Sequence, residues 1–409
     1  MVESSENIIQ ARIEKSDRLL FSLFILIIPI LAGINLFAPW FCGVFLLIKL
    51  VSHIPIEKYI VRFSYPLLIP FVLGLVYVGG HEIRHILRDL VYYSFPVIAV
   101  LLAYFAKYIY SKTDFYRLLV LSGSIYSIYY IIQAYVTFDT ILFDPMLVRY
   151  SVGTGTPIIV ISLLILLFSS LNVEIVKRVT LIILHLFILF LFYSRVYFGS
   201  FFFCLLIYSF YKFASRSKLI GGFLFLIFGL MAAALILPVF LSSKSDIAQK
   251  FMVSITEMFA TEFVDVEDIT HNWRAYEAYE ALNELDNQSV FQKIFGMGFG
   301  KVIHFEYPLL NEEGALDEIP IFHNGFIYYL VKTGVLGVVC YIYFFINIAI
   351  KTIKRGCDDI FDLSLILGSI TSVLLAILVV NGAHSGESFC FILVIIFLYI
   401  KEINRNTYG

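Results

Sequence analysis

Long apolar runs separated by short polar breaks occupy most of the 409-residue chain. A helix that crosses a membrane needs roughly 20 mostly apolar residues, because it must span the hydrocarbon layer. The pattern therefore predicts an all-α fold, a polytopic membrane helical bundle of about 12 transmembrane helices. We expect these helices at residues 19–37, 39–54, 65–80, 89–110, 115–137, 152–171, 177–194, 196–214, 218–241, 322–350, 360–381 and 386–402.

One long polar stretch, 243–321, interrupts this pattern and divides the chain into three parts. An N-terminal membrane bundle over 1–242 precedes it, and three further spans with a polar tail follow it over 322–409. The glycines of "FGMGFGK" near its end predict a tight turn. Apolar residues recur in it at the spacing of amphipathic helices. We expect short helices of this kind over the mouth of the bundle, carried by Ile247, Phe251, Ile255, Trp273, Tyr276, Tyr279 and Leu282.

Composition agrees with a membrane protein. Hydrophobic residues make up 60% of the chain and charged residues 15%, whereas soluble domains carry about 25% charged residues. The net charge is −2 and the basic residues are scattered through short loops, so no basic stripe indicates a nucleic-acid partner. Four of the five cysteines lie in apolar runs and none lies in 243–321. A disulfide framework or a cysteine metal site is therefore not indicated.

Basic residues indicate which side of the membrane each loop faces. With the N-terminus in the cytoplasm, every inner segment is basic, as at Lys58, Lys177 and Lys351, which is the bias that membrane proteins show. An even number of spans then puts both termini in the cytoplasm and the stretch 243–321 outside. This outer loop holds fifteen acidic and five basic residues, a net charge of −10.

Two arginines are candidates for binding an anionic ligand at the outer face. Arg195 stands between two apolar runs, and Arg274 is the only arginine of the acidic loop. A guanidinium stays charged and grips two phosphate oxygens at once. Each arginine also has a structural alternative: Arg195 as an interfacial residue that reaches lipid head groups, and Arg274 as the salt-bridge partner of Glu277 or Glu280.

The stretch "HEIRHILRDL" holds further candidates at the outer start of the fourth span. Arg84 and Arg88 lie there, and Asp89 is expected to neutralise them. His81 and His85 have the spacing of a helical metal pair, but no HExxH pattern or fixed carboxylate accompanies them. We therefore expect no metal site and favour a structural role for both arginines.

The histidine of "IPIFHNGFIYYLVKTGVLG" has a distinct setting, where the outer loop meets the tenth span. Asn324 suits the cap of the helix that follows, because its side chain accepts from free backbone N–H groups. A cap does not require the preceding His323. Histidine is the side chain that takes and returns a proton near neutral pH, so His323 is a candidate general base.

Three motifs in this order resemble the superfamily of Wzy-type O-antigen polymerases and O-antigen ligases. They are "SRVYFGS" at an outer helix end, "NWRAYEAYEAL" followed by "IFGMGFGK" in the outer loop, and "HNGFIYYLVKTGVLG" at the next span. The likeness covers roughly 190–340, and the twelve-span layout extends it to the whole chain.

The resemblance implies an inverting, metal-independent membrane glycosyltransferase of the GT-C type, without cofactor, in the bacterial inner membrane. Polyprenyl-diphosphate-linked oligosaccharide would be both donor and acceptor. Arg195 and Arg274 would bind the diphosphate, and His323 would be the base. Asn324, Arg88 and Arg84 are candidate supporting residues, although the resemblance assigns no role to Arg84 and Arg88. A chain-length regulator and a flippase are the implied protein partners.

Four functions remain open from the sequence. A polymerase joins lipid-linked repeat units into a surface polysaccharide, whereas a ligase moves the finished polymer to lipid A–core. We favour the polymerase because the outer loop carries no cluster of basic residues for an anionic core. A lipid-linked oligosaccharide flippase or another transporter would also explain twelve spans, but such proteins place their charges near the bilayer midplane. A receptor or scaffold that only binds glycan is the remaining, non-catalytic alternative.

Overall fold

The fold comes from a computed structural model that describes residues 15–34, 37–138, 145–153, 155–192, 194–214, 263, 269, 272–311, 314–357, 359–379 and 386–408. The first half of the chain forms α2 (Lys15–Ile34), α3 (Phe37–Val51), α4 (Lys58–Val76), α5 (Ile83–Ile109), α6 (Lys112–Phe138), α7 (Pro145–Val152), α8 (Ile158–Phe168), α9 (Ile175–Phe192) and α10 (Arg195–Ala214). The second half forms α14 (Trp273–Asp286), α15 (Val290–Phe295), β1 (Ile303–Asn311), β2 (Gly314–Ile319), α16 (Gly325–Arg355), α17 (Ile360–Val379) and α18 (Gly386–Tyr408).

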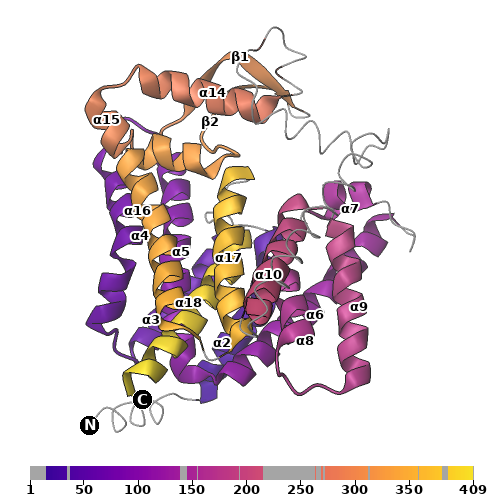
Figure 1. The fold of residues 1–409 in the computed structure, drawn as a ribbon. Helices are drawn as coiled ribbons and strands as arrows, with labels where there is room; N and C mark the ends of the chain where they lie inside the picture. Colours follow the sequence, from indigo (N-terminus) through magenta and orange to yellow (C-terminus); the bar gives the residue numbers. More distant parts are fainter. Residues whose placement is uncertain are drawn as a thin grey trace.

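The predicted all-α membrane bundle is confirmed (Figure 1). Among the described residues, six helices are long and apolar enough to cross a membrane, namely α4, α5, α6, α9, α16 and α17. The helices α3, α8 and α10 are apolar but shorter. The predicted ninth span, 218–241, lies outside the described residues, so the total of twelve spans stays a prediction.

The predicted sixth span, 152–171, is shorter than expected. Its helix, α8, covers Ile158–Phe168, and α7 is a separate helix before it. Gly153 and Gly155 between them have φ values of +110° and +86°, a region that right-handed helices do not use. The glycines therefore interrupt what hydropathy alone joins into one segment.

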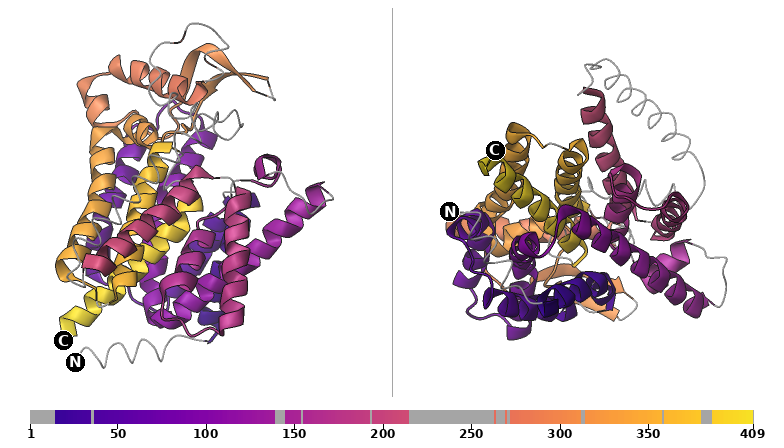
Figure 2. Two further views of the ribbon diagram at one scale, coloured as in Figure 1. Left: turned by 45° about the vertical axis from the view of Figure 1, so that its right-hand side comes forward. Right: turned by 90° about the horizontal axis from the view of Figure 1, so that it is seen from below.

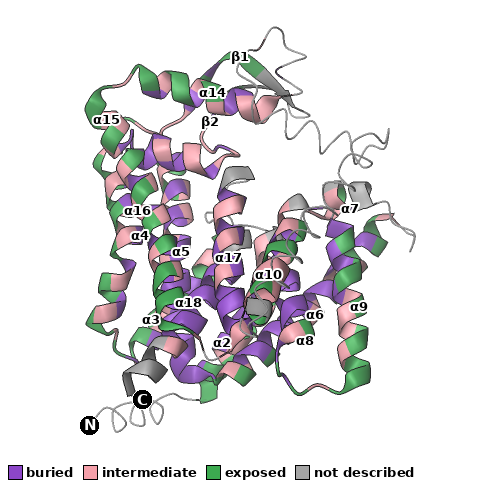
Figure 3. Ribbon diagram, viewed as in Figure 1, coloured by how far each residue is buried: buried purple, intermediate pink, exposed green. Residues whose placement is uncertain are grey.

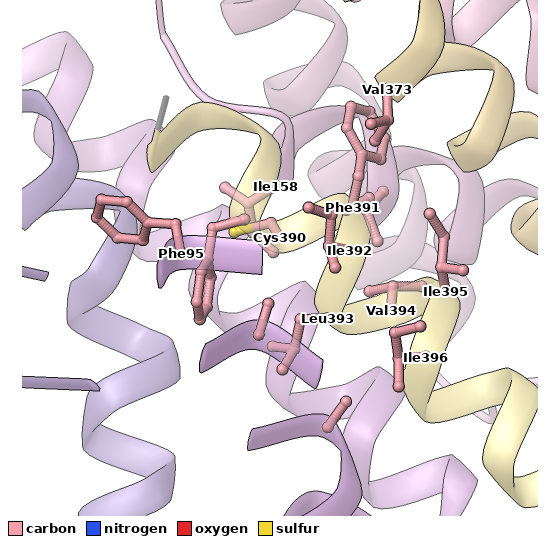
Figure 4. Packing of buried hydrophobic residues seen from close by; sticks show 14 of the residues in the cluster. Phe95, Ile158, Val373, Cys390, Phe391, Ile392, Leu393, Val394, Ile395 and Ile396 are labelled. Atoms are coloured by element: carbon pink, nitrogen blue, oxygen red, sulfur yellow. The ribbon is translucent and has the colours of Figure 1, made fainter. Parts of the chain in front are cut away.

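The centre of the bundle is built around α18. Its residues from Phe389 to Ile400 are all buried, and the helix packs against α5, α17 and α2. Figure 4 shows Phe391–Ile396 of α18 among Phe95 of α5, Ile158 of α8 and Val373 of α17. The helices α6, α8 and α9 lie to one side of this core, and α3 and α4 lie to the other (Figure 2).

A layer of short elements covers one end of the bundle (Figure 1). It contains α14, which the sequence indicated, together with α15 and an antiparallel hairpin of β1 and β2, which the sequence analysis did not predict. The helix expected around Ile247, Phe251 and Ile255 lies outside the described residues. Ile303 pairs with Ile319 and His304 with Glu318. The pairing of the strands depends on contacts between residues on opposite sides of the hairpin. The helical spacing of apolar residues in the sequence gives no information on such contacts.

The buried face of α14 also differs from the prediction. Trp273 and Leu282 were expected on one apolar stripe, but Leu282 is exposed. Steps of three residues turn by about 300° on a helix, so three such steps place a residue on the opposite side. The buried positions are Tyr276, Glu277, Ala281 and Leu285, and the last three follow a four-residue spacing instead.

Helix α16 is broken at Gly334, and the outer layer is bound to the bundle at this break. Gly334 has φ +67° and ψ −175°, so the carbonyls of the preceding turn need partners outside the helix. Val331 O accepts from the amide of Met297 (2.8 Å), and Lys332 O accepts from Gly298 (3.1 Å). The part of α16 after the break spans about 30 Å at 1.5 Å per residue, enough to cross a bilayer alone.

These contacts belong to an extended segment, residues 296–301, which we call the glycine segment. The sequence analysis expected a tight turn here. Instead the segment runs between α4, α5 and α16: Phe299 donates its amide to Gly74 O (2.7 Å) and is fully buried. A Cβ on Gly298 would lie 2.5 Å from Tyr77 O. Glycine is therefore required by close backbone approach.

A buried ion pair fixes the same junction. Lys332 Nζ lies 2.8 Å from Asp89 Oδ2, and both side chains are inaccessible to solvent. The same carboxylate accepts from Tyr328 Oη (2.5 Å) and from the amide of Gly300 (2.8 Å). Asp89 therefore joins α5, α16 and the glycine segment, and it does not neutralise Arg84 and Arg88 as the sequence analysis expected.

Removing one member of this pair leaves an unpaired buried charge. We expect Lys332→Met to lower the free energy of unfolding by about 3–5 kcal/mol, as for buried ion pairs broken from one side. Adding Asp89→Asn should restore part of the loss, because the charge is then gone. Helical circular dichroism during unfolding in detergent measures both effects. Lys293→Met is the control, since its pair with Asp286 is at the surface. Equal losses from Lys332→Met and Lys293→Met would contradict the assignment.

Candidate functional site

The candidate site lies where the hairpin leads into α16. Asn324 is the N-cap of α16, and its Oδ1 accepts from the amides of Phe326 (2.9 Å) and Ile327 (3.2 Å). The expected capping role of Asn324 is confirmed. The cap fixes the backbone immediately after His323, so the imidazole is attached to a rigid part of the chain.

His323 is held by α14, which lies over the start of α16. Glu277 Oε2 accepts from the backbone amide of His323 (3.1 Å) and lies 3.2 Å from its Nδ1. The Glu277 side chain is 3% exposed, whereas that of His323 is 43% exposed. An ionised carboxylate only accepts hydrogen bonds, so Nδ1 carries the proton in this pair and Nε2 is left with its lone pair in the neutral imidazole.

Trp273 connects His323 with one of the candidate arginines. Its ring meets the imidazole edge-on, with 4.2 Å between ring centroids. On the same indole, the guanidinium carbon of Arg274 lies 5.3 Å from the ring centroid, within the range of a cation–π contact. The structure therefore brings His323 and Arg274 together around one tryptophan.

The position of α14 is set by its contacts with the hairpin. Tyr276 stacks on Phe305 of β1, with centroids 5.5 Å apart, and its hydroxyl accepts from the Tyr307 amide (2.9 Å). Burial raises the pKa of Tyr276 to about 12. Burial also raises the pKa of the nearby Glu280 carboxyl, and the charge of Glu306 raises it further. Tyr276 is therefore a neutral hydrogen-bonding residue near neutral pH.

Arg195 is the first residue of α10. The preceding helix α9 ends at Phe192, so only two residues separate the two helices, close to the predicted spans 177–194 and 196–214. This connection lies toward the upper end of the bundle in Figure 1, the end that also carries α14 and the hairpin. The side chain of Arg195 lies outside the described atoms, so its part in the site stays a prediction.

Arg84 and Arg88 have local partners at the start of α5. Arg84 Nε donates to Glu82 Oε2 (2.5 Å), and a guanidinium nitrogen of Arg88 donates to His85 Nδ1 (2.7 Å). These contacts fit the structural role favoured from the sequence. Within the described part of the chain, no group of three or more His, Cys, Asp or Glu side chains could hold a metal ion.

The sequence analysis missed the role of Glu277, which it considered only as a partner of Arg274. It also treated Trp273 only as an apolar residue of an amphipathic helix and left Lys332 unmentioned. Lys332 had a detectable signal, because a lysine inside an apolar run requires a partner. Glu277 had none, because the loop holds fifteen acidic residues and nothing local distinguishes this one.

Comparison with known proteins supports the resemblance seen in the motifs. The family model described as O-antigen ligase matches residues 179–342, a range that includes Arg195, Arg274, Glu277 and His323. No curated protein matched the chain. The family indicates an enzyme that transfers glycosyl groups and uses lipid-linked oligosaccharides in a membrane. The matched residues 179–342 thus belong to the O-antigen polymerase and O-antigen ligase superfamily, and the apolar helices indicate a multi-pass membrane protein.

Proposed function

We propose that the protein is a polysaccharide polymerase that joins polyprenyl-diphosphate-linked oligosaccharide repeat units into a surface polysaccharide. The observation that carries this proposal is the half-exposed His323, whose Nδ1 faces the buried carboxylate of Glu277. An arginine lies on the same indole as the imidazole. A base beside a cation suits a reaction in which a hydroxyl loses a proton and a diphosphate departs.

In the proposed reaction, the acceptor hydroxyl oxygen attacks the anomeric carbon of the donor sugar. The bond from that carbon to the diphosphate oxygen breaks, and its electron pair leaves with the polyprenyl diphosphate. Nε2 of His323 takes the hydroxyl proton. Glu277 holds the ring in the required tautomer and stabilises the imidazolium that forms, as an orienting carboxylate does in other histidine bases. One displacement inverts the anomeric centre.

The leaving group requires positive charge rather than an acid, because a diphosphate departs as a stable anion. We assign this role to Arg274 and Arg195, whose guanidiniums suit paired phosphate oxygens. Fixed charges of this kind stabilise the transition state without reorganising. The proposal therefore uses no metal or cofactor, as expected for an inverting enzyme of the GT-C type.

The three parts 1–242, 243–321 and 322–409 then have distinct roles. The two membrane parts hold the lipid-linked substrates at the surface of the bacterial inner membrane, and the outer part carries Arg274 and Glu277. A ligase that transfers finished polymer to lipid A–core would use the same residues. The polymerase is favoured because the outer loop has a net charge of −10, which opposes an anionic acceptor.

Glycan ladders on gels test the proposed function in a strain that lacks the chromosomal copy of the gene. We expect His323→Ala and Arg274→Ala to leave a single repeat unit on the core, because polymerisation requires the base and the cation. His304→Ala and Arg117→Ala are matched controls, since both side chains are exposed. The controls should restore the wild-type ladder.

Two other results would decide against the proposal. If attached repeats vanish and lipid-linked polymer accumulates, the protein is the ligase. If both site variants restore a normal ladder, the catalytic assignment is wrong, and a flippase or a glycan-binding scaffold becomes the better explanation.

The role of Glu277 is tested separately by Glu277→Gln. The amide still accepts from the His323 backbone, but it lacks the charge that stabilises an imidazolium. We expect polymerisation by the purified enzyme to slow on the order of 10²-fold, the lower range of general-base assistance. Glu280→Gln, one turn along α14, should retain most of the rate. A rate for Glu277→Gln equal to that of Glu280→Gln would exclude the orienting role.

The proposed orientation has both termini in the cytoplasm and the hairpin outside. Green fluorescent protein fused to the C-terminus should therefore fluoresce, because it folds in the cytoplasm. Alkaline phosphatase inserted after Asn311, at the hairpin tip, should be active, because it requires the outer compartment. The reverse pair of results would show that the bundle has the opposite orientation.

A further inference from the structure

Helix α15 exposes apolar side chains although it lies outside the candidate membrane spans. Val290 is 73% exposed, Phe291 53% and Ile294 42%. A capping box stabilises the helix: Ser289 accepts from the Gln292 amide, and the Gln292 side chain accepts from the Ser289 amide. The exposed residues are therefore held in a defined helix.

The exposed apolar residues share one face of α15. At about 100° per residue, Val290, Phe291 and Ile294 fall within roughly a third of the helix circumference. Lys293 lies about 110° around the helix from the centre of this face, and its Nζ lies 2.6 Å from Asp286 Oδ1 at the end of α14. The helix thus separates an apolar face from a charged face that is turned toward the outer layer.

This apolar face continues the exposed surface of two membrane spans. The ring of Phe291 contacts Tyr77, the residue that ends α4, with 6.2 Å between centroids. The last turns of α4 expose Val72 and Val76. Figure 3 shows exposed residues on α15 and along α4 on the same side of the molecule.

The second span is α16, on which α15 packs directly. A Cβ on Gly334 would lie 2.2 Å from Ile294 O, so α15 lies against the break itself. Just beyond the break, α16 exposes Val335 and Val339, at the spacing of one helix face. Both spans are long and apolar enough to cross a membrane, so exposed valines on them face lipid.

We propose that α15 lies in the lipid–water interface, with Val290, Phe291 and Ile294 against the lipid. Helices with an apolar face and a charged opposite face lie in this region, parallel to the membrane plane. Because α15 leads directly into the glycine segment, its contact with lipid fixes the depth of that segment relative to the membrane. The amide of Gly300 in this segment is the donor to Asp89. Lipid, rather than a protein partner, is favoured because the face continues that of two spans.

The test adds one indole to the full chain in lipid nanodiscs. Phe291→Trp reports on the apolar face of α15, and Tyr307→Trp is the control, because Tyr307 of the hairpin is 50% exposed. Because the wild-type protein already contains two tryptophans, its emission is subtracted from that of each variant to give the emission of the added indole. We expect lipid brominated near its head group to quench Phe291→Trp, and aqueous acrylamide to quench it at least about twofold less than Tyr307→Trp.

The opposite pattern would overturn the proposal. If acrylamide quenches both indoles equally and brominated lipid quenches neither, α15 faces water or a protein. Val290→Trp gives the same readout from a more exposed position on the same face, so the test does not depend on the folding of one variant. Neither position belongs to the proposed active site, so failure here leaves the proposed function unaffected.

Discussion

The arrangement of the outer layer depends on a buried lysine that must be paired. A charge in an apolar bundle is costly unless a partner compensates it, and Lys332 meets Asp89 where no solvent reaches either side chain. The same carboxylate binds the Gly300 amide, so the pair forms fully only when the glycine segment is in place. Folding of the bundle and docking of the outer layer are therefore coupled.

A second carboxylate applies the same constraint nearer the site. Glu277 is almost fully buried, and its Oε2 faces both the backbone amide and Nδ1 of His323. Rotation of the imidazole would remove the Nδ1 donor from the buried Oε2 of Glu277. The loss of a hydrogen bond to a buried oxygen is costly, so the carboxylate resists rotation of the ring. Asp89 fixes the position of the first part of α16 through Tyr328 and Lys332, and Glu277 fixes the orientation of the His323 ring.

The sequence predicted what hydropathy and local capping determine. Most predicted spans coincide with described helices because a bilayer requires long apolar segments, although the sixth is shorter than predicted and the ninth lies outside the described residues. Asn324 was correctly identified as a cap. The break at Gly334 escaped prediction, because one glycine in an apolar run does not reveal the chain that packs against it. The pairing of Glu277 with His323 joins residues 46 positions apart. The hairpin was missed because its register depends on contacts between strands.

The hairpin has a consequence for how such a protein could diverge. Its base is fixed, since Ile303 and Ile319 are buried and paired, whereas Tyr307 is half exposed toward the tip. The groups that hold His323 come from α14 and α16 and not from the tip. Mutations and insertions at the tip are therefore close to neutral for the histidine, and natural selection can vary this surface while the chemistry stays constant.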